Sequence, residues 1–550
     1  MPISLDRASR LAALEGEQFD VIVIGGGIIG AGIARDAALR DLRVALFEKR
    51  DFGSGTTAGS TRLIHGGLRY LELLDFGLVR MDLRERETLL RIAPHLVKPL
   101  EFIIPFYEST IFYRCKMKLG MTLYDLLSYD KSLPRHRFLS AGELKKIEPN
   151  LRQPGLQGAA VYFDAQADSP ERLCLENIID ACEHGAQTFN YSEVTGASRT
   201  GELIDGVRVR DLLSDDDMEI SVKGRIVINA SGAWFDRVAR GLTNGSRAAK
   251  PPRTQIRTTK GIHITCPPVT SRAVVVLSPI DGRLMFVIPW LGHSLIGTTD
   301  TDFTDDPAIA NATSEDVDYV LRSVTDYFPT LDTARIYFSN AGVRALVKEE
   351  GSESSVSRMH RILDGARLGT ENLISVLGGK ITGYRAIAEE VVDAVCAKLN
   401  VYAPCLTARN SLPGARTDRK ITHVSGAGLR DETHAHLFNL YGSSRSSEII
   451  QLATSCEHLR EPLSPHTPDV AAQVIFAARN EQCARLVDFL LRRTLLGFSQ
   501  DQGQSAAARA ASLLAQELAW TPGRMSAEME LYQKHIAMTQ AFRDGNSQGE

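Results

Sequence analysis

The feature that most constrains the fold of this chain is a glycine-rich turn between a buried strand and a helix near the N-terminus. Residues 19–24 (FDVIVI) are apolar and rich in β-branched side chains, a pattern typical of a strand buried on both faces. Three glycines follow at G-x-G-x-x-G spacing, namely Gly25, Gly27 and Gly30. A helical pattern and a second apolar run, residues 43–47, lead to Glu48. This order predicts a βαβ unit of the Rossmann type.

Each part of this unit suits a dinucleotide. Gly25 permits the tight turn, Gly27 lets the backbone approach a pyrophosphate, and Gly30 lets the helix pack closely on the strand. The helix N-terminus offers free N–H groups and a positive dipole end to the phosphates. Glu48 can accept hydrogen bonds from ribose hydroxyls and would repel a 2′-phosphate, which disfavours NADP. The spacing alone does not separate FAD from NAD, although the Ser/Thr/Gly-rich stretch 53–67 favours the longer cofactor, FAD.

Length and charge narrow the class of protein. A chain of 550 residues is too long for one ordinary domain, so we expect at least two. Its 63 basic and 67 acidic residues give a net charge of −4, which gives no support for nucleic-acid binding. The N-terminus lacks the pattern of a signal peptide, and no run of about 18 apolar residues could span a bilayer. Eight scattered cysteines without a C-x-x-C pair predict neither a zinc site nor a redox dithiol, and we expect no metal.

The rest of the chain divides into a mixed region and a helical one. Residues 273–277, 284–290 and 293–299 have the pattern of strands, and residues 372–399 predict a strand, a glycine turn and a long helix. From about residue 430 onward the periodicity is helical. We therefore expect a domain boundary near 405–415.

Several longer motifs identify a family. They include STRLIHGGLRYLE (60–72), RERETLLRIAPHLV (84–97), YFDAQADSPERL, KGIHI, FVIPW, IGTTD, LGGKITGYR and the late FLLRRT. Together they resemble the FAD-dependent glycerol-3-phosphate dehydrogenases, the membrane-associated aerobic enzymes, from about residue 19 to residue 540. Agreement over so many separate motifs decides for FAD as the cofactor.

The resemblance implies an architecture. It predicts an α/β FAD-binding Rossmann-type domain of the glycine/D-amino-acid oxidase type, a substrate domain built on an antiparallel sheet, and an all-α C-terminal domain. The FAD-dependent region would span residues 18–404, with its substrate-binding part mainly in 85–160 and 253–340. The helical domain would span 405–545.

The resemblance also implies an activity. It predicts oxidation of sn-glycerol 3-phosphate at C2 to dihydroxyacetone phosphate, with hydride transfer to FAD and electrons passed to a membrane quinone. We expect a cytoplasmic protein in peripheral contact with the inner face of the cell membrane, and a homodimer is compatible with the sequence. Residues 102–129 combine apolar and basic side chains, which suits either a membrane interface or a buried helical hairpin with a basic edge.

The substrate phosphate needs cations, because a phosphomonoester carries close to two negative charges near neutral pH. The matched motifs assign this task to Arg69, Arg344 and Lys380, with Tyr70 and Thr382 as hydroxyl donors.

Alcohol oxidation also needs a group that takes the hydroxyl proton as the hydride leaves, and histidine is the usual choice. His263 is the preferred catalytic candidate and His65 the second, while Arg344 can stabilise a developing alkoxide. The residues expected to bind FAD are Gly25, Gly27, Gly30, Glu48, Thr56, Thr57, Ser60, His65, Gly66, Gly67, Gly232, Gly379 and Lys380.

Three departures from the family pattern leave the exact substrate open. Ala345 stands where proline is common, Gly383 replaces a threonine, and DSPERL (168–173) replaces a DDARL-like motif. The alternatives are a related FAD enzyme acting on a hydroxy or amino acid, a glycerol-3-phosphate oxidase that uses oxygen, and a flavoprotein without catalysis.

Overall fold

The computed structural model describes residues 7–72, 74–107, 110–201, 203–214, 218–243, 255–348, 360–368, 370–416 and 428–543. The chain forms two compact units, each assembled from separate stretches of sequence. The first unit comprises residues 1–58, 169–258 and 344–534. The second comprises residues 59–168, 259–343 and 535–550. Both units are therefore built from segments that are distant in sequence.

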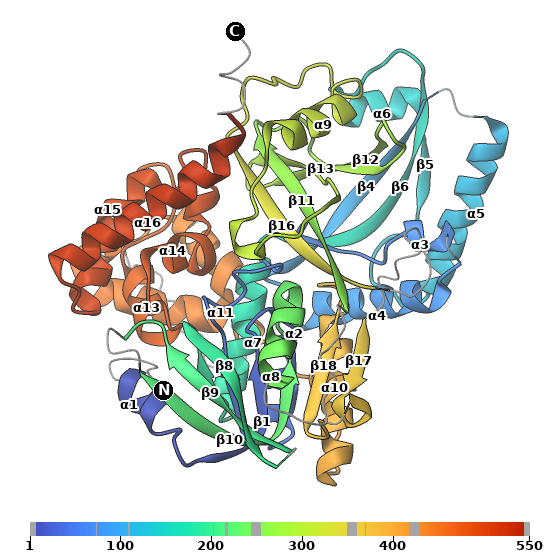
Figure 1. Ribbon diagram of the computed structural model, residues 1–550. Coiled ribbons are helices and arrows are strands. Elements are labelled where there is room, and N and C mark those ends of the chain that lie inside the picture. The colour runs from blue at the N-terminus through green and yellow to red at the C-terminus, as the bar shows by residue number, and fades with distance from the viewer. Residues whose placement is uncertain are drawn as a thin grey trace. The chain divides into compact units, whose positions relative to one another are not determined.

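The first unit contains a mainly parallel sheet in the strand order β17-β18-β10-β1-β2-β7. Figure 1 labels β1, β10, β17 and β18 of this sheet. β1 lies between β10 and β2 and is parallel to both, while β17 is antiparallel to β18 and the β8–β9 hairpin extends from β10. The strands are β1 (Gln18–Ile24), β2 (Val44–Phe47), β7 (Gln187–Phe189), β8 (Ser192–Thr200), β9 (Leu203–Asp211), β10 (Glu219–Asn229), β17 (Arg361–Asp364) and β18 (Leu373–Leu377). The buried βαβ unit predicted from the N-terminal sequence is the centre of this sheet.

Three helices associate closely beside this sheet: α2 (Ile28–Leu39), α7 (Pro170–Glu183) and α10 (Tyr384–Leu399). A Cβ at Gly32 of α2 would lie 2.9 Å from the ring of Tyr384, so a glycine permits the close approach of α10. Asn177 of α7 donates to the hydroxyl of the same tyrosine at 3.1 Å. Helices α1 (Arg7–Ala12) and α8 (Phe235–Thr243) complete this part.

The C-terminal helices also belong to the first unit as far as residue 534. They are α11 (Asp431–Ser455), α12 (Glu457–Arg460), α13 (Ala472–Asn480), α14 (Leu486–Asp488), a π-helical turn (Phe489–Arg493), a 3-10 turn (Leu496–Phe498), α15 (Gln504–Glu517) and α16 (Pro522–Gln540). Gly442 interrupts α11 with a φ of 69°, so this stretch is two helices joined at a kink. The all-α C-terminal region expected from the periodicity is confirmed.

The second unit contains a larger, mostly antiparallel sheet in the strand order β15-β11-β14-β13-β12-β4-β6-β3, with β16 beside β11 and β5 beside β6. Its strands are β3 (Leu63–Ile64), β4 (Val97–Tyr107), β5 (Arg137–Ser140), β6 (Leu156–Ala167), β11 (Ile256–Cys266), β12 (Ala273–Leu277), β13 (Leu284–Trp290), β14 (His293–Gly297), β15 (Thr301–Asp302) and β16 (Phe338–Val347). β4 and β12 pair in parallel, so this pair departs from the antiparallel arrangement that was expected. Its helices are α3 (Arg69–Glu72), α4 (Phe76–Ile92), α5 (Ile111–Leu127), α6 (Ala141–Ile147) and α9 (Ser314–Val324).

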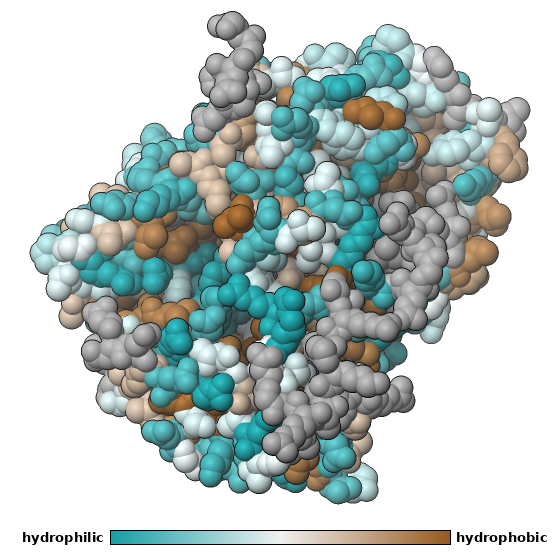
Figure 2. Space-filling model, viewed as in Figure 1, coloured by the Kyte–Doolittle hydropathy of each residue, from teal (hydrophilic) through white to brown (hydrophobic). Residues whose placement is uncertain are grey.

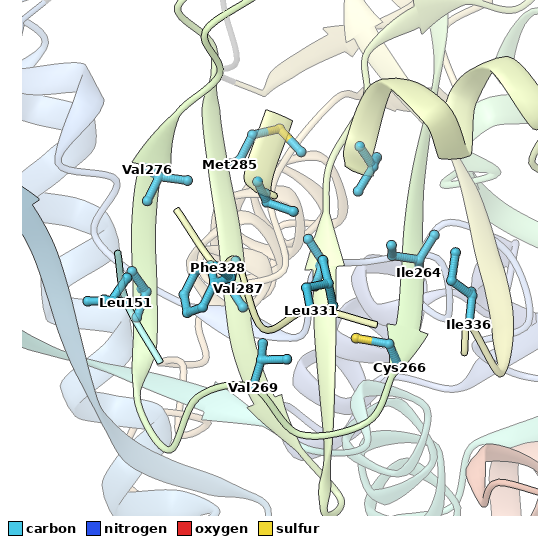
Figure 3. Close-up of a cluster of buried hydrophobic side chains, with 14 of the residues drawn as sticks. Leu151, Ile264, Cys266, Val269, Val276, Met285, Val287, Phe328, Leu331 and Ile336 are labelled. Atoms are coloured by element: carbon cyan, nitrogen blue, oxygen red, sulfur yellow. The ribbon is translucent and has the colours of Figure 1, made fainter. Parts of the chain in front are cut away.

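The core of the second unit lies between this sheet and its covering helices. Side chains such as Ile264, Val276 and Val287 point from β11, β12 and β13 into one cluster (Figure 3). Phe328 and Leu331, which follow α9, fill the same cluster and are almost fully buried. The strands predicted at 273–277, 284–290 and 293–299 are present as β12, β13 and β14, and β12 and β14 are buried along most of their length.

The prediction for residues 102–129 is corrected by the structure. Residues 102–107 belong to the long strand β4, and only the part from Ile111 to Leu127 is helical. The segment is therefore not a helical hairpin, because its first part supplies backbone hydrogen bonds to a sheet, and contact with a membrane interface stays a prediction. Among the described residues, none of the helices combines the length and apolar character that crossing a bilayer requires.

Candidate cofactor and substrate site

The glycine turn after β1 is packed on one side and open on the other. Gly25 has a φ of 106°, and a Cβ there would lie 2.7 Å from the carbonyl oxygen of Ala230. A Cβ at Gly30 would lie 1.9 Å from the carbonyl oxygen of Gly25. At Gly27, in contrast, the nearest atom to a Cβ would be Thr57 Oγ1 at 3.6 Å. The turn thus leaves space beside Gly27, which fits the close approach of a pyrophosphate.

The first backbone groups of α2 are partly satisfied from the segment that follows β2. Gly27 precedes the helix and has no side chain to cap it, and Thr57 Oγ1 accepts a hydrogen bond from Ile28 N at 3.1 Å. Thr57 is buried, whereas Thr56 beside it is exposed. The remaining N–H groups at this helix N-terminus suit an anion.

Glu48 closes the other side of the turn. Its carboxylate accepts hydrogen bonds from Gly26 N at 2.7 Å and from Arg50 N at 2.8 Å. Burial raises the pKa of Glu48, and these two backbone hydrogen bonds offset only part of that effect. The carboxyl group is held at the end of β2, where its remaining lone pairs can accept hydrogen bonds from ribose hydroxyls.

Two more predicted residues lie after neighbouring parallel strands of the same sheet. Gly232 follows β10, has a φ of 57°, and has no atom within 4 Å of a Cβ placed there. Gly379 follows β18, has a φ of 104°, and precedes Lys380 and the buried Thr382. The structure therefore brings Gly25, Glu48, Gly232 and Gly379 to the carboxyl edge of one parallel sheet, where open α/β sheets bind their ligands.

The remaining candidates belong mainly to the second unit. His263 lies in β11 opposite Gly297, is 1% exposed, and its Nε2 lies 3.0 Å from Thr61 Oγ1. A Cβ at Gly297 would lie 2.5 Å from the ring of His263, so this glycine makes room for the imidazole. Near them, Ser60 Oγ is buried and has no hydrogen-bond partner among the described residues, which fits a ligand atom at this position.

The IHGG motif forms the turn between β3 and α3. His65 is partly buried and its ring lies edge-on to that of Phe286 at 6.3 Å. Gly66 N donates to the hydroxyl of Tyr124, and Gly67 has a φ of 69°. Tyr70 lies in α3, directly after this turn.

The two arginines predicted to bind the substrate phosphate are placed differently. Arg69 begins α3, and its side chain lies outside the described part of the chain. Arg344 is half-buried in β16, where the chain passes from the second unit to the first. Lys380 belongs to the first unit and His263 to the second.

Some residues of this region had no predicted role. Tyr124 donates to both oxygens of Asp164 at 3.0 and 2.7 Å, and Arg86 donates to the same carboxylate, so these three buried groups support Gly66. Arg86 lies in RERETLLRIAPHLV and Asp164 in YFDAQADSPERL, two of the motifs that identified the family. Membership in a shared motif was the available signal, but it does not separate a supporting residue from one that touches a ligand.

The DSPERL departure has a structural explanation. Ser169 caps α7 by accepting from Arg172 N at 3.1 Å, and Pro170 occupies the first turn of the helix, where it is tolerated. Arg172 is fully buried and pairs with Glu176 and with Glu481 of the C-terminal helices. The motif thus begins a helix and pairs it with the C-terminal region.

Comparison with known proteins agrees with this geometry. A family model described as FAD dependent oxidoreductase matches residues 20–393, and one described as the C-terminal domain of alpha-glycerophosphate oxidase matches residues 405–525. The chain is 40% identical to a glycerol-3-phosphate dehydrogenase of Synechocystis sp. over 538 residues, which cover 95% of this chain and 97% of that relative. It is 34% identical to a glycerol-3-phosphate dehydrogenase of Mycobacterium leprae over 542 residues, which cover 96% and 90%. The crystal structure of the glycerol-3-phosphate dehydrogenase from Bacillus halodurans, complexed with FAD, is similar with a TM-score of 0.79, 28% identity and 97% coverage of each chain.

The fold and the glycine turn after β1 define the class of protein, an FAD-dependent oxidoreductase. Within that class, the chain belongs to the family of FAD-dependent glycerol-3-phosphate dehydrogenases. The predictions of the family, the fold class and FAD as the cofactor are confirmed. The roles of the individual site residues stay predictions.

Proposed function

We propose that this protein oxidises sn-glycerol 3-phosphate to dihydroxyacetone phosphate and passes the electrons to a membrane quinone. In this reaction the C2 carbon loses a hydride and the C2 hydroxyl loses a proton. Bound FAD supplies the hydride acceptor. The observation that carries the proposal is the glycine turn at the carboxyl edge of the parallel sheet. Gly379 and Lys380 follow β18 at that same edge.

In the proposed site, the protein binds FAD through the glycine turn and the segments after β2, β10 and β18. Gly27 and the N-terminus of α2 bind the pyrophosphate, and Glu48 accepts hydrogen bonds from ribose hydroxyls. Lys380, Arg344 and Arg69 bind the substrate phosphate, with Tyr70 and Thr382 as hydroxyl donors.

His263 is the proposed acceptor of the hydroxyl proton. Its Nε2 contacts Thr61 Oγ1, which fixes the orientation of the ring, and burial excludes bulk water from it. His65 remains the second candidate, because it lies in the turn that also carries Gly66 and Gly67. Arg344 would stabilise negative charge that develops on the substrate oxygen.

An anaerobic titration tests the substrate. Addition of glycerol 3-phosphate to the purified flavoprotein should bleach the flavin absorbance, whereas phosphate-free hydroxy acids and amino acids should not. Bleaching by one of those acids instead would favour the related oxidases, and no bleaching by any of them would favour a flavoprotein without catalysis.

Lys380→Ala gives a sharper test of phosphate recognition. Loss of one charge-assisted hydrogen bond should weaken glycerol 3-phosphate binding by about 10- to 100-fold. The matched control is Lys146→Ala, because Lys146 is an exposed lysine on α6. If the two variants have the same KM and flavin content, Lys380 does not bind the phosphate.

The electron acceptor is a separate question, because the family model for the C-terminal region is named after an oxidase. Reoxidation of the substrate-reduced protein should be fast with a soluble quinone analogue and slow with oxygen. Equally fast reoxidation by oxygen, with formation of hydrogen peroxide, would identify the oxidase alternative.

The proposed membrane contact is a surface of the second unit formed by α5 and the start of α4. Phe112, Leu119 and Leu126 recur at intervals of seven residues along α5 and are 79%, 71% and 66% exposed. Figure 2 shows hydrophobic atoms along the edge of the molecule where α5 runs. Exposed Lys116 lies within one helical turn of Phe112, so apolar and basic groups share one surface.

The start of α4 extends this surface. Arg80 of α4 donates to the carbonyl oxygen of Leu127 at 2.9 Å and pairs with Asp130. The exposed Leu74 and Phe76 lie within six residues of Arg80, just before and at the start of α4. We call Leu74, Phe76, Phe112, Leu119 and Leu126 the α5 surface.

A further inference from the structure

A buried cluster of charges joins the C-terminal helices to the segment that follows β2. Asp51 comes three residues after Glu48 and is 1% exposed. Arg493 donates to both of its carboxylate oxygens, at 2.6 and 2.9 Å, and Arg492 donates to Asp51 through Nε. Three hydrogen bonds thus cross from one short stretch of the C-terminal region to a single carboxylate.

The cluster is electrically balanced. Arg492 also donates to Asp488 at 2.6 Å, and Tyr191 donates to the same carboxylate. Two arginines therefore face two aspartates, and all four side chains are less than 10% exposed. Burial alone would raise the pKa of Asp51, but the adjacent Arg493 and Arg492 outweigh it and hold the pKa below its ordinary range. Loss of either partner would leave an uncompensated buried charge.

Local geometry explains how two consecutive arginines reach one carboxylate. Arg492 and Arg493 lie in a π-helical turn, a conformation that is rare and occurs frequently at functional sites. Arg493 is held further by donating to the carbonyl oxygen of Glu481. Asn190 donates to Asp51 at 2.8 Å and to the carbonyl oxygen of Gln482, which adds a second connection.

The segment around Asp51 contacts the dinucleotide turn directly. Glu48 accepts from Gly26 N, and Gly53 N donates to the carbonyl oxygen of Gly26 at 2.9 Å. Phe52 is 1% exposed, and its ring lies 2.7 Å from where a Cβ at Gly26 would be. Thr57, a few residues on, accepts from Ile28 N. A shift of Asp51 would therefore be transmitted to both sides of the turn.

We propose that Arg492 and Arg493 are positioning residues for FAD: the C-terminal helices clamp Asp51 and thereby hold the wall formed by residues 48–57 in its FAD-binding geometry. FAD binding and docking of the C-terminal helices are then linked, and each stabilises the other. This inference requires FAD but no particular substrate, so the outcome of its test is independent of the proposed reaction.

The test compares conservative variants by their affinity for FAD. Arg493→Lys keeps the charge but loses the two-pronged contact, and Arg492→Lys leaves the Arg493 pair intact. Titration of each apoprotein with FAD, followed by flavin fluorescence, should give dissociation constants raised about tenfold or more. The matched control is Arg479→Lys, because Arg479 makes a two-pronged pair with Glu517 within the C-terminal helices but is about half exposed. The control should bind FAD as the wild type does.

Hydrogen exchange provides a second measurement. In the wild type, FAD should slow amide exchange in residues 484–493, and in Asp51→Asn this protection should be lost. If Asp51→Asn does not fold, the two lysine variants carry the same measurement. The proposal is overturned if the lysine variants melt at lower temperature yet bind FAD within twofold of the wild type and keep the FAD-dependent protection, because the cluster would then be only a structural connection.

Discussion

At the scale of single residues, the three glycines of the dinucleotide motif are required for different reasons. Gly25 and Gly30 leave no space for a Cβ, because backbone oxygens lie 2.7 and 1.9 Å from where it would be. Gly27 has such space within the protein, since only Thr57 Oγ1 comes within 4 Å. Folding therefore requires glycine at Gly25 and Gly30, whereas at Gly27 the proposed contact with the pyrophosphate is the reason for glycine.

Alanine at these positions should separate stability from cofactor affinity. Gly30→Ala should destabilise the apoprotein by about 1–3 kcal/mol, because the backbone of Gly25 must move. Gly27→Ala should change apoprotein stability by less than about 0.5 kcal/mol but weaken FAD binding, because its Cβ would enter the space for the pyrophosphate. Urea unfolding of the apoproteins and FAD titration measure the two effects. Equal FAD affinity of Gly27→Ala and the wild type would contradict the assigned position of the pyrophosphate.

The identity of the proton acceptor is a second question at this scale. If His263 is the base, His263→Gln should slow substrate-dependent flavin reduction by about 10²- to 10⁴-fold and abolish the acidic limb of the kcat/KM pH profile. Its flavin content should stay unchanged. The control is His293→Gln, because His293 opens the neighbouring strand β14 and its ring contacts that of Tyr337. Normal flavin reduction in His263→Gln, together with slow reduction in His65→Gln, would assign the role to His65.

At the scale of helices and strands, the motif DSPERL (168–173), whose departure from the family pattern left the substrate open, has a structural role. It caps α7 and pairs this helix with other parts of the chain. Ser169 begins this helix and Arg172 joins it to Glu481, so the departure from the family pattern changes a helix start. The C-terminal helices depend on similar pairs. One is His436 of α11, whose Nε2 lies 2.8 Å from Asp469.

This pair predicts a pH window for stability. Burial alone would lower the pKa of His436, but Asp469 outweighs it and raises the pKa; the same contact lowers the pKa of Asp469 despite its burial. The histidine contribution is fully present below its unfolded pKa of about 6.5 and is lost as pH rises through the folded value. The aspartate contribution is present above about pH 4 and is lost as pH falls through its depressed folded value.

His436→Gln should therefore lower stability most between about pH 4 and 6.5, by about 1.5–3 kcal/mol, and progressively less toward pH 9. Thermal melting across this range measures the difference from the wild type. His458→Gln serves as the control, because His458 is exposed and pairs only at the surface with Glu461. A difference that does not vary with pH would show that the pair is not charged in the folded protein.

At the scale of the whole molecule, the two units are each assembled from segments far apart in the chain. Asp51 and Arg493 are 442 positions apart. Strands β10 and β18 of the parallel sheet follow residues 59–168, which belong to the second unit. The α5 surface belongs to residues 59–168 and is exposed, although none of the described helices is long and apolar enough to span a bilayer. Membrane contact, in this proposal, involves the surface of one unit.

The α5 surface predicts binding to anionic vesicles. Leu119→Glu and Leu126→Glu should each weaken sedimentation with phosphatidylglycerol vesicles by about tenfold or more, because each removes an exposed leucine that would enter the lipid and adds a charge that the anionic lipid repels. Added salt should weaken binding of the wild type. The matched control is Ile309→Glu, since Ile309 is an exposed apolar residue elsewhere in the same unit. If Ile309→Glu impairs binding as much as the α5 variants do, the contact lies elsewhere.

Much of the fold follows from short-range patterns. The periods of apolar residues predicted β1, β12, β13 and β14, and glycine spacing predicted the turn before α2. The family motifs predicted FAD. The substrate roles of Arg69, Arg344, Lys380 and His263 remain hypotheses, because a motif shows that a residue type recurs without showing which atom it touches.

The sequence by itself thus determined the elements, the glycine cradle and the family, because strand and helix periodicity and the conformational demands of glycine act between near neighbours. Only the tertiary structure decided that residues 102–107 join a sheet while Phe112, Leu119 and Leu126 of α5 are exposed. It also decided that Arg492 and Arg493 contact the segment after β2. Burial and ion pairing depend on which distant segments the fold brings together. A local pattern does not identify those partners. The contacts of Arg492 and Arg493 with Asp51 could therefore be recognised only in the tertiary structure.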